Sequence, residues 1–154
     1  MRARSESTFL VVSFMVAFLV LAGPADAAVW YVDGSKPTSG DGTSWHEAVR
    51  TIQEAVVLAA FTDQIRVRAG VYQLGSAIQL IDRDYRIYGG FAGLEDTLAE
   101  RDWVANQVVI DGSALSVPCF SIEAGSPVID GLRITRCHGE PSFGNGGAIE
   151  MREC

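Results

Sequence analysis

Lysine is almost absent from this sequence: Lys36 is the only one, and 12 basic residues face 19 acidic ones. The formal net charge is −7 at pH 7. Nucleic acids and anionic lipid surfaces repel a chain of this charge, so both classes of partner are disfavoured. An acidic surface is compatible with solubility, with divalent cations and with neutral glycans.

Cysteine and histidine are scarce as well. The three cysteines are Cys119, Cys137 and Cys154, and their spacing matches no zinc-binding pattern. In an oxidising compartment Cys119 and Cys137 can form a disulfide, and buried free thiols are the alternative. The only histidines are His46 and His138. His46 is expected at an exposed position, and His138 in a loop, where no recognisable catalytic pattern supports a role as a general base.

Long apolar runs are missing apart from one, at residues 9–23. Two arginines precede this run, and small residues at positions 25 and 27 follow it, which is the pattern of a secretory signal peptide at residues 1–27. We expect cleavage between Ala27 and Ala28, and a secreted or cell-surface protein without a membrane span in its mature part. A retained membrane anchor is the alternative, although the run is short for a bilayer.

Only one segment has a strong helical pattern. Ser44 and Glu47 form a potential capping box, and apolar residues then recur at helical spacing. We expect a helix at about Ser44–Ala60. Residues 28–63 would thus contain a first strand at Val29–Val32, a glycine-rich loop and this helix.

The rest of the chain, residues 64–154, consists of short apolar runs separated by glycine, which predict strands. The runs are Ile65–Arg68, Ile78–Ile81, Tyr85–Tyr88, Val108–Ile110, Phe120–Ile122, Val128–Ile134 and Gly147–Met151. Connections this short exclude crossover helices and leave an antiparallel sandwich or a solenoid. Ile65, Ile87, Val109, Ile129 and Ile149 lie 20–22 residues apart, which favours a parallel β-helix with one turn per interval. The predicted helix would then cover the open first coil.

Several stretches occur in an order that resembles a known family. They are Trp30–Gly34, Gly40–Trp45, Arg68–Tyr72, Ile87–Gly93, Arg101–Trp103, Val109–Gly112 and Gly146–Ile149. In this order they are similar to exported bacterial right-handed parallel β-helix proteins with a pectin-lyase-like fold, of the polymorphic outer-membrane type. The resemblance implies an all-β solenoid. It implies no single activity, because one fold hosts many functions.

The resemblance leaves three functions open. The leading one is a non-catalytic binding or display module, with a polysaccharide or cell-surface glycan as the partner. The second is a pectate-lyase-like lyase or a glycoside hydrolase whose active site lies on coils beyond residue 154, and the third is a structural stalk. The lyase and polygalacturonase motifs of this fold are missing, and Cys137-His138-Gly139 is the nearest approach to one of them. No catalytic residue and no required cofactor is therefore assigned.

Two binding chemistries remain as expectations. Asp111 and Asp130 each precede a glycine in a repeated Val-Ile-Asp-Gly sequence and could stack to hold Ca²⁺, or they could simply favour a bend. Asp33 and Asp41 flank the glycine-rich loop, and they too could hold a cation or simply favour a turn. Aromatic residues offer faces for sugar rings or for packing; they are Trp30, Tyr31, Trp45, Tyr88, Phe91 and Trp103.

The end of the sequence carries a last expectation. Residue 154 directly follows a predicted strand, without a capping helix or a polar final coil. Solenoids are normally capped at both ends, so the β-helix is expected to continue beyond this sequence. The 154-residue chain by itself is then expected to be marginally stable or to associate.

Overall fold

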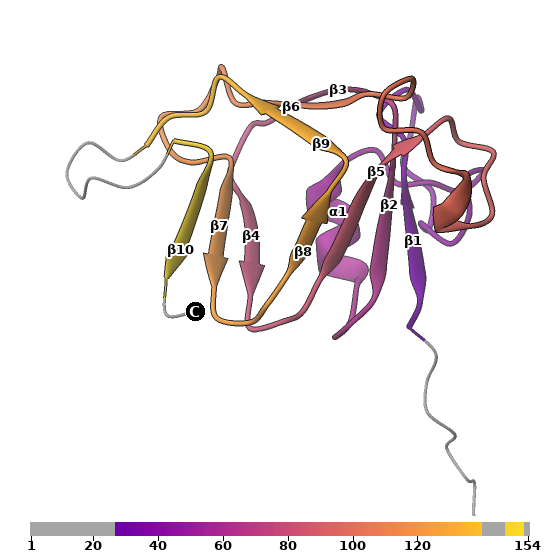
Figure 1. Ribbon diagram of the computed structural model, residues 1–154, viewed down its shortest axis with the longest axis horizontal. Coiled ribbons are helices and arrows are strands. Elements are labelled where there is room, and N and C mark those ends of the chain that lie inside the picture. The colour runs from indigo at the N-terminus through magenta and orange to yellow at the C-terminus, as the bar shows by residue number, and fades with distance from the viewer. Residues whose placement is uncertain (1–26, 140–146, 153–154) are drawn as a thin grey trace, which may run out of the picture.

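Strands dominate the computed structural model, which describes residues 27–139 and 147–152 (Figure 1). Every strand pairing in these ranges is parallel. The elements are β1 (Val29–Val32), α1 (Ile52–Leu58), β2 (Gln64–Arg68), β3 (Gly70–Gln73), β4 (Ile78–Ile81), β5 (Arg86–Phe91), the 3₁₀ helix η1 (Leu98–Glu100), β6 (Val108–Asp111), β7 (Phe120–Glu123), β8 (Val128–Asp130), β9 (Leu132–Thr135) and β10 (Ile149–Arg152).

β1 and β2 are neighbours in one sheet, but from β2 onwards strands that follow one another in the chain belong to different sheets. The sheet orders are β1-β2-β5-β8, β3-β6-β9 and β4-β7-β10. From β2 onwards the chain therefore visits three parallel sheets in turn and repeats the same order with β5, β6 and β7 and with β8, β9 and β10. A single residue separates β2 from β3 and β8 from β9, and in the second case this residue is Gly131, which makes a sharp turn at a φ of 70°.

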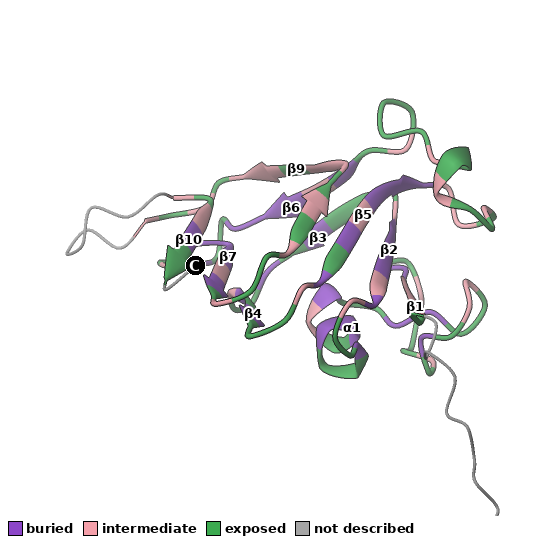
Figure 2. Ribbon diagram, turned by 60° about the horizontal axis from the view of Figure 1, so that its bottom comes forward, coloured by how far each residue is buried: buried purple, intermediate pink, exposed green. Residues whose placement is uncertain are grey.

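One hydrophobic core lies among the three sheets. Strand β4 shows how alternation builds it, because Ile78 and Leu80 are buried while Gln79 and Ile81 are exposed. Strand β7 alternates in the same way, whereas β2 and β5 each contain three consecutive buried residues; burial is shown by colour in Figure 2. The core cluster includes Ile65, Val67, Tyr72, Ile78, Leu80, Ile87, Val108, Ile110, Phe120 and Ile122. Residues from all three sheets thus stabilise one another.

The predicted helix at Ser44–Ala60 is only partly correct. Helix α1 begins at Ile52, after the N-cap Thr51, whose side chain forms a capping box with Glu54. The preceding residues are held by β1 instead, because Val49 donates to the Tyr31 carbonyl and its own carbonyl accepts from the Asp33 amide. This extended bridge prevents a helix there. The shortened helix still buries Ile52, Ala55 and Val56, and it packs against β1, β2 and β4.

The prediction of one β-helix turn for each interval of about twenty residues is also wrong. Ile87 pairs with Ile65, 22 residues before it, and with Ile129, 42 residues after it. Val109 lies in another sheet, opposite Val71 and Arg133, and Ile149 lies opposite Phe120 in the third. The passage from β5 to β8 is longer because it contains η1 and the loop between β6 and β7.

The predicted signal peptide, apart from Ala27, lies outside the described residues, and so does Cys154. Within 27–139 and 147–152, no helix has the length and apolar character needed to cross a membrane.

Candidate functional site

An exposed aromatic and charged cluster lies where β5, β8 and the segment after η1 meet. We call Tyr88, Arg101, Trp103 and Asp130 the Arg101 cluster. Tyr88 and Asp130 are direct partners across β5 and β8. The Arg101 guanidinium carbon lies 5.1 Å from the centroid of the Tyr88 ring and 5.3 Å from that of the Trp103 ring, within cation–π range of both. Arg101 Nη2 also forms an ion pair with the Asp130 carboxylate.

The loop that carries Trp103 is fixed against β5. The Asp102 amide donates to the Gly90 carbonyl at 2.8 Å, and the Asp102 carboxylate accepts from the amides of Val104 and Ala105 at 2.9 Å. Gly90 has a φ of 97°, and a Cβ there would lie 2.9 Å from the Trp103 nitrogen. Only glycine permits this close approach, so the position of Trp103 is set by backbone contacts.

The polar and aromatic groups of the Arg101 cluster face the outside to different degrees. Trp103 is 56% exposed, while the Asp130 side chain is 49% exposed and that of Arg101 only 14%. Arg101 Nη1 is buried and has no hydrogen-bond partner among the described residues. An open hollow of about 220 Å³ adjoins the cluster. It is lined by Trp103, Gln107, Val108, Gly131, Leu132 and Arg133.

This arrangement suits a ligand with one apolar face and several hydroxyl groups. The indole ring of Trp103 offers a flat surface for stacking. The half-exposed Asp130 carboxylate can accept hydrogen bonds from hydroxyls, and the largely buried Arg101 holds this carboxylate in place through their ion pair. Asp130 neutralises Arg101, so the cluster itself has no net charge, and Arg133 is the one charged residue among the described residues that line the adjoining hollow.

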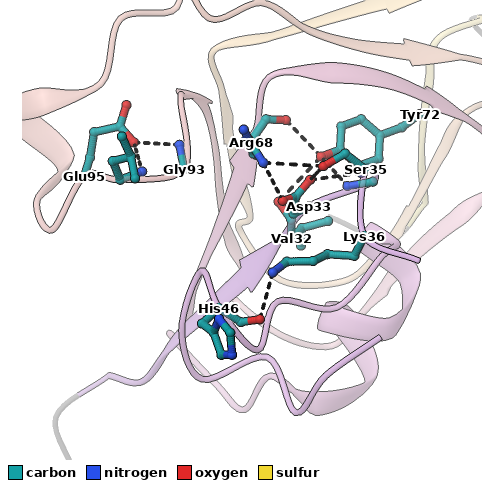
Figure 3. Close-up of polar contacts among 11 residues, drawn as sticks. Val32, Asp33, Ser35, Lys36, His46, Arg68, Tyr72, Gly93 and Glu95 are labelled. Carbon is teal, nitrogen blue, oxygen red and sulfur yellow. Dashed lines mark hydrogen bonds and ion pairs between the residues drawn. The ribbon is translucent and has the colours of Figure 1, made fainter. Parts of the chain in front are cut away.

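A second polar cluster joins the end of β1 to β2 and β3 (Figure 3). Asp33 is 3% exposed and accepts hydrogen bonds from the Ser35 hydroxyl at 2.6 Å, the Ser35 amide at 2.9 Å and Arg68 Nη1 at 2.7 Å. The Tyr72 hydroxyl donates to the Arg68 carbonyl at 2.9 Å and accepts from the Gly34 amide at 3.2 Å. These groups satisfy one another, which points to a structural role.

The pKa values in this second cluster follow from burial and hydrogen bonding. Burial alone would raise the pKa of Asp33, but the hydrogen bonds from Ser35 and Arg68 outweigh it and lower the pKa below its ordinary value. Burial raises the pKa of Tyr72 to about 12. At neutral pH Asp33 is therefore charged and Tyr72 is protonated.

Replacing Asp33 with asparagine is expected to destabilise the protein by about 1–3 kcal/mol at pH 7, because charge-assisted hydrogen bonds are lost. The pKa of Asp33 is lower in the folded than in the unfolded chain, so its contribution is complete above pH 3.8. It disappears as the pH falls through the lowered folded-state pKa. Urea unfolding of both proteins at several pH values measures the difference.

Asp41→Asn is the matched control, since Asp41 is exposed and, among the residues that the structure describes, accepts from Thr43 of its own loop alone. We expect a much smaller loss for this variant. Equal losses for Asp33→Asn and Asp41→Asn, or a loss for Asp33→Asn that persists under acid, would contradict the structural role of the Asp33 ion pair.

Glu95, also drawn in Figure 3, fills a concave loop of backbone amides. Its carboxylate accepts from Ala92, Gly93 and Leu94 at 2.6–2.9 Å. Such a nest of N–H groups can bind an anion. In this protein the carboxylate of Glu95 occupies the position of such an anion, and its hydrogen bonds close the loop after β5.

Asp111 and Asp130 do not stack as expected. Asp111 lies at the end of β6 opposite Gln73 and Thr135, while Asp130 is in another sheet. Asp111 is 1% exposed, forms an ion pair with Arg136 and accepts from the Ser113 amide. The hydrogen bonds from Ser113 and Arg136 lower its pKa. A Ca²⁺ role for either residue stays a prediction, and the described residues contain no group of three His, Cys, Asp or Glu side chains placed to hold a metal ion.

The other candidates have mostly packing roles. His46 is exposed beside Glu47, outside any helix, and His138 is exposed after β9. Trp45 packs against Tyr31 and Phe91 at centroid distances of 4.8 and 5.5 Å. Of the six aromatic candidates, Tyr88 and Trp103 are thus the two that meet in the exposed cluster.

Cys119 and Cys137 form a disulfide with a Cα–Cα distance of 5.5 Å. The structure thereby selects the bridge over the alternative of free thiols. The bridge connects the start of β7 to the residue that follows Arg136, the partner of Asp111. It fastens the long loop between β6 and β7 to the end of β9.

No protein-family model, curated protein or solved structure matches this chain. The functional argument therefore depends on its own residues.

Proposed function

We propose that the chain is an exported right-handed parallel β-helix module, secreted or on the cell surface, that binds a neutral glycan without cleaving it. The observation that carries the proposal is the Arg101 cluster. It combines a rigidly held, exposed indole ring with a carboxylate and a guanidinium whose charges balance.

The order of the sheets supports the β-helix. Three parallel sheets are visited in the same sequence by successive groups of strands, around one shared core. Stacking of this kind buries apolar residues that no single group of three strands could bury alone. A right-handed path agrees with the handedness of parallel connections in general.

Export is supported by two independent features. The first 27 residues have the charged start, apolar run and small-residue cleavage site of a signal peptide. The Cys119–Cys137 disulfide is of a kind that persists in oxidising compartments and is rare in the cytosol.

The Trp103→Ala variant tests the binding site. We expect it to weaken glycan binding by about 1–2 kcal/mol, or five- to thirtyfold, because the stacking surface is lost. Isothermal titration of the processed protein with a panel of soluble neutral and acidic polysaccharides measures this. The neighbouring Val104→Ala is the matched control, since Val104 is 71% exposed and lies outside the cluster.

Three results would overturn the proposal. Equal affinities of the wild type and Trp103→Ala would remove the Arg101 cluster as the binding site. The appearance of shortened chains when the polysaccharides are incubated with the wild type would replace a binding module by a lyase or hydrolase. Absence of binding to every polysaccharide would favour a structural stalk.

A further inference from the structure

Asp63 is a buried carboxylate between α1 and β2 that the proposed glycan site does not use. It is 6% exposed, and its oxygens accept three hydrogen bonds. The donors are the Ala60 amide at 2.8 Å, the indole Nε1 of Trp30 at 2.9 Å and the backbone nitrogen of Ala28 at 2.8 Å. These bonds outweigh the effect of burial and keep the pKa of Asp63 below its ordinary value, so the group is an anion at neutral pH.

The charge of Asp63 has no ion-pair partner among the described residues. Arg83 contributes a favourable field, but its guanidinium donates to the Ala59 carbonyl. Burying a carboxylate costs free energy that neutral donors offset only in part. The site is therefore one that a cation at hydrogen-bond distance would stabilise.

Ala28 is the residue whose nitrogen would acquire such a charge. Its peptide bond to Ala27 is the predicted cleavage position. The nitrogen is held in place from the other side, because the Ala28 carbonyl accepts from the Gln64 amide at 2.9 Å and Val29 pairs with Gln64 in the β1–β2 ladder. Removal of residues 1–27 would leave these contacts in place.

We propose that signal-peptide cleavage creates an ion pair between the new α-ammonium group of Ala28 and the Asp63 carboxylate, which fastens β1 to β2 in the mature protein. Hydrolysis of the Ala27–Ala28 bond by a signal peptidase consumes one water. The oxygen of this water completes the carboxylate of Ala27, and the liberated amine of Ala28 takes up a proton. A hydrogen bond from a neutral N–H to the carboxylate is thereby replaced by one in which donor and acceptor carry opposite charges. The inference rests on the proposed export.

The scarcity of lysine makes this ion pair easy to test. After cleavage the protein has two amines, the α-amine of Ala28 and the side chain of Lys36. An ion pair with Asp63 raises the pKa of the α-amine and reduces its reactive neutral fraction. The full chain is expressed in an exporting bacterial host, and the processed protein is labelled near neutral pH with a trace of acetic anhydride and quantified by peptide mass spectrometry.

We expect the first residue to be Ala28 and its labelling to be roughly tenfold faster in Asp63→Asn than in the wild type, equivalent to one pKa unit. Lys36 is the internal control and should react equally in both. Asp63→Asn should also melt several degrees lower. Because asparagine can still accept from Trp30 and Ala60, this variant separates the lost charge from lost packing.

A second variant tests the geometry without touching Asp63. One alanine inserted between Ala27 and Ala28, with cleavage still after Ala27, moves the amine one residue away. We expect this amine to react as fast as that of Asp63→Asn.

Equal labelling of the α-amine in the wild type, the insertion variant and Asp63→Asn would overturn the ion pair, and so would a first residue other than Ala28. Both results leave export intact. Failure of export itself appears differently, as unprocessed chain that stays in the cells, and it would overturn both proposals.

Discussion

Replacing Phe120 with alanine is expected to lower the free energy of unfolding by about 3–5 kcal/mol, the usual cost of removing a buried aromatic ring. Phe120 is completely buried in β7, the middle strand of its sheet. It lies in register with Ile78 on one side and Ile149 on the other. The cavity would therefore affect all three passages of the chain, and urea unfolding followed by circular dichroism measures the loss.

Phe61→Ala provides a matched control with the same chemical change. Phe61 follows α1 and is 60% exposed, so its removal should change the stability by no more than about 0.5 kcal/mol. Similar losses for the two variants would show that the core does not lie among the three sheets as described.

Loss of the Cys119–Cys137 disulfide is expected to cost about 3 kcal/mol, because the bridge closes a loop over a separation of 18 residues and restricts the unfolded chain. The residues around the disulfide pack closely against it. Cys119 is fully buried, and Gly112 lies so near that a Cβ there would be 2.5 Å from the Cys119 sulfur. The double variant Cys119→Ala and Cys137→Ala should unfold at a lower urea concentration than the wild type.

Reductant supplies the control for the disulfide. Cys154→Ser is introduced into both proteins so that no third thiol can exchange. Dithiothreitol should then lower the unfolding midpoint of the protein with Cys119 and Cys137 to that of the double variant, and leave the double variant unchanged. The reduction of Cys119 and Cys137 is verified by thiol labelling. If the unfolding midpoint of the bridged protein then stays the same in dithiothreitol, the bridge does not stabilise the fold.

The strands were largely predictable from local pattern, because alternation and β-branched residues encode them directly. The expected ranges Val29–Val32 and Ile78–Ile81 coincide with β1 and β4. β3 was missed, since Gly70–Gln73 begins with glycine and has an exposed Val71. The helix was placed too early because two capping boxes follow one another, Ser44 with Glu47 and Thr51 with Glu54, and the pairing of Val49 with β1 decides between them.

The repeat could not be obtained from intervals in the sequence. Equal spacing of Val and Ile residues does not reveal how much loop each passage contains. The passage from Ile87 to Ile129 is nearly twice as long as the one before it, and this difference places Val109 in a different sheet.

Of the candidate site, the sequence indicated two aromatic residues, but not that they lie together. Tyr88 and Trp103 were recognised, whereas the pairing of Arg101 with Asp130 joins residues 29 apart and requires the correct register of β5 and β8. Asp63 gave no signal at all, because its importance comes from the backbone nitrogen of Ala28, which lies 35 residues away.

The proposed function depends on the claim that, from β2 onwards, successive strands pass through three parallel sheets in turn, and methyl NOEs between isoleucines test it most directly. In the processed protein, labelled at isoleucine δ1 methyl groups, Ile87 should show NOEs to both Ile65 and Ile129, because in-register neighbours in a sheet lie about 5 Å apart. Ile110 should likewise show an NOE to Ile134. Absence of the Ile65–Ile87 and Ile87–Ile129 cross-peaks would contradict the arrangement of the strands on which the site and its function are built.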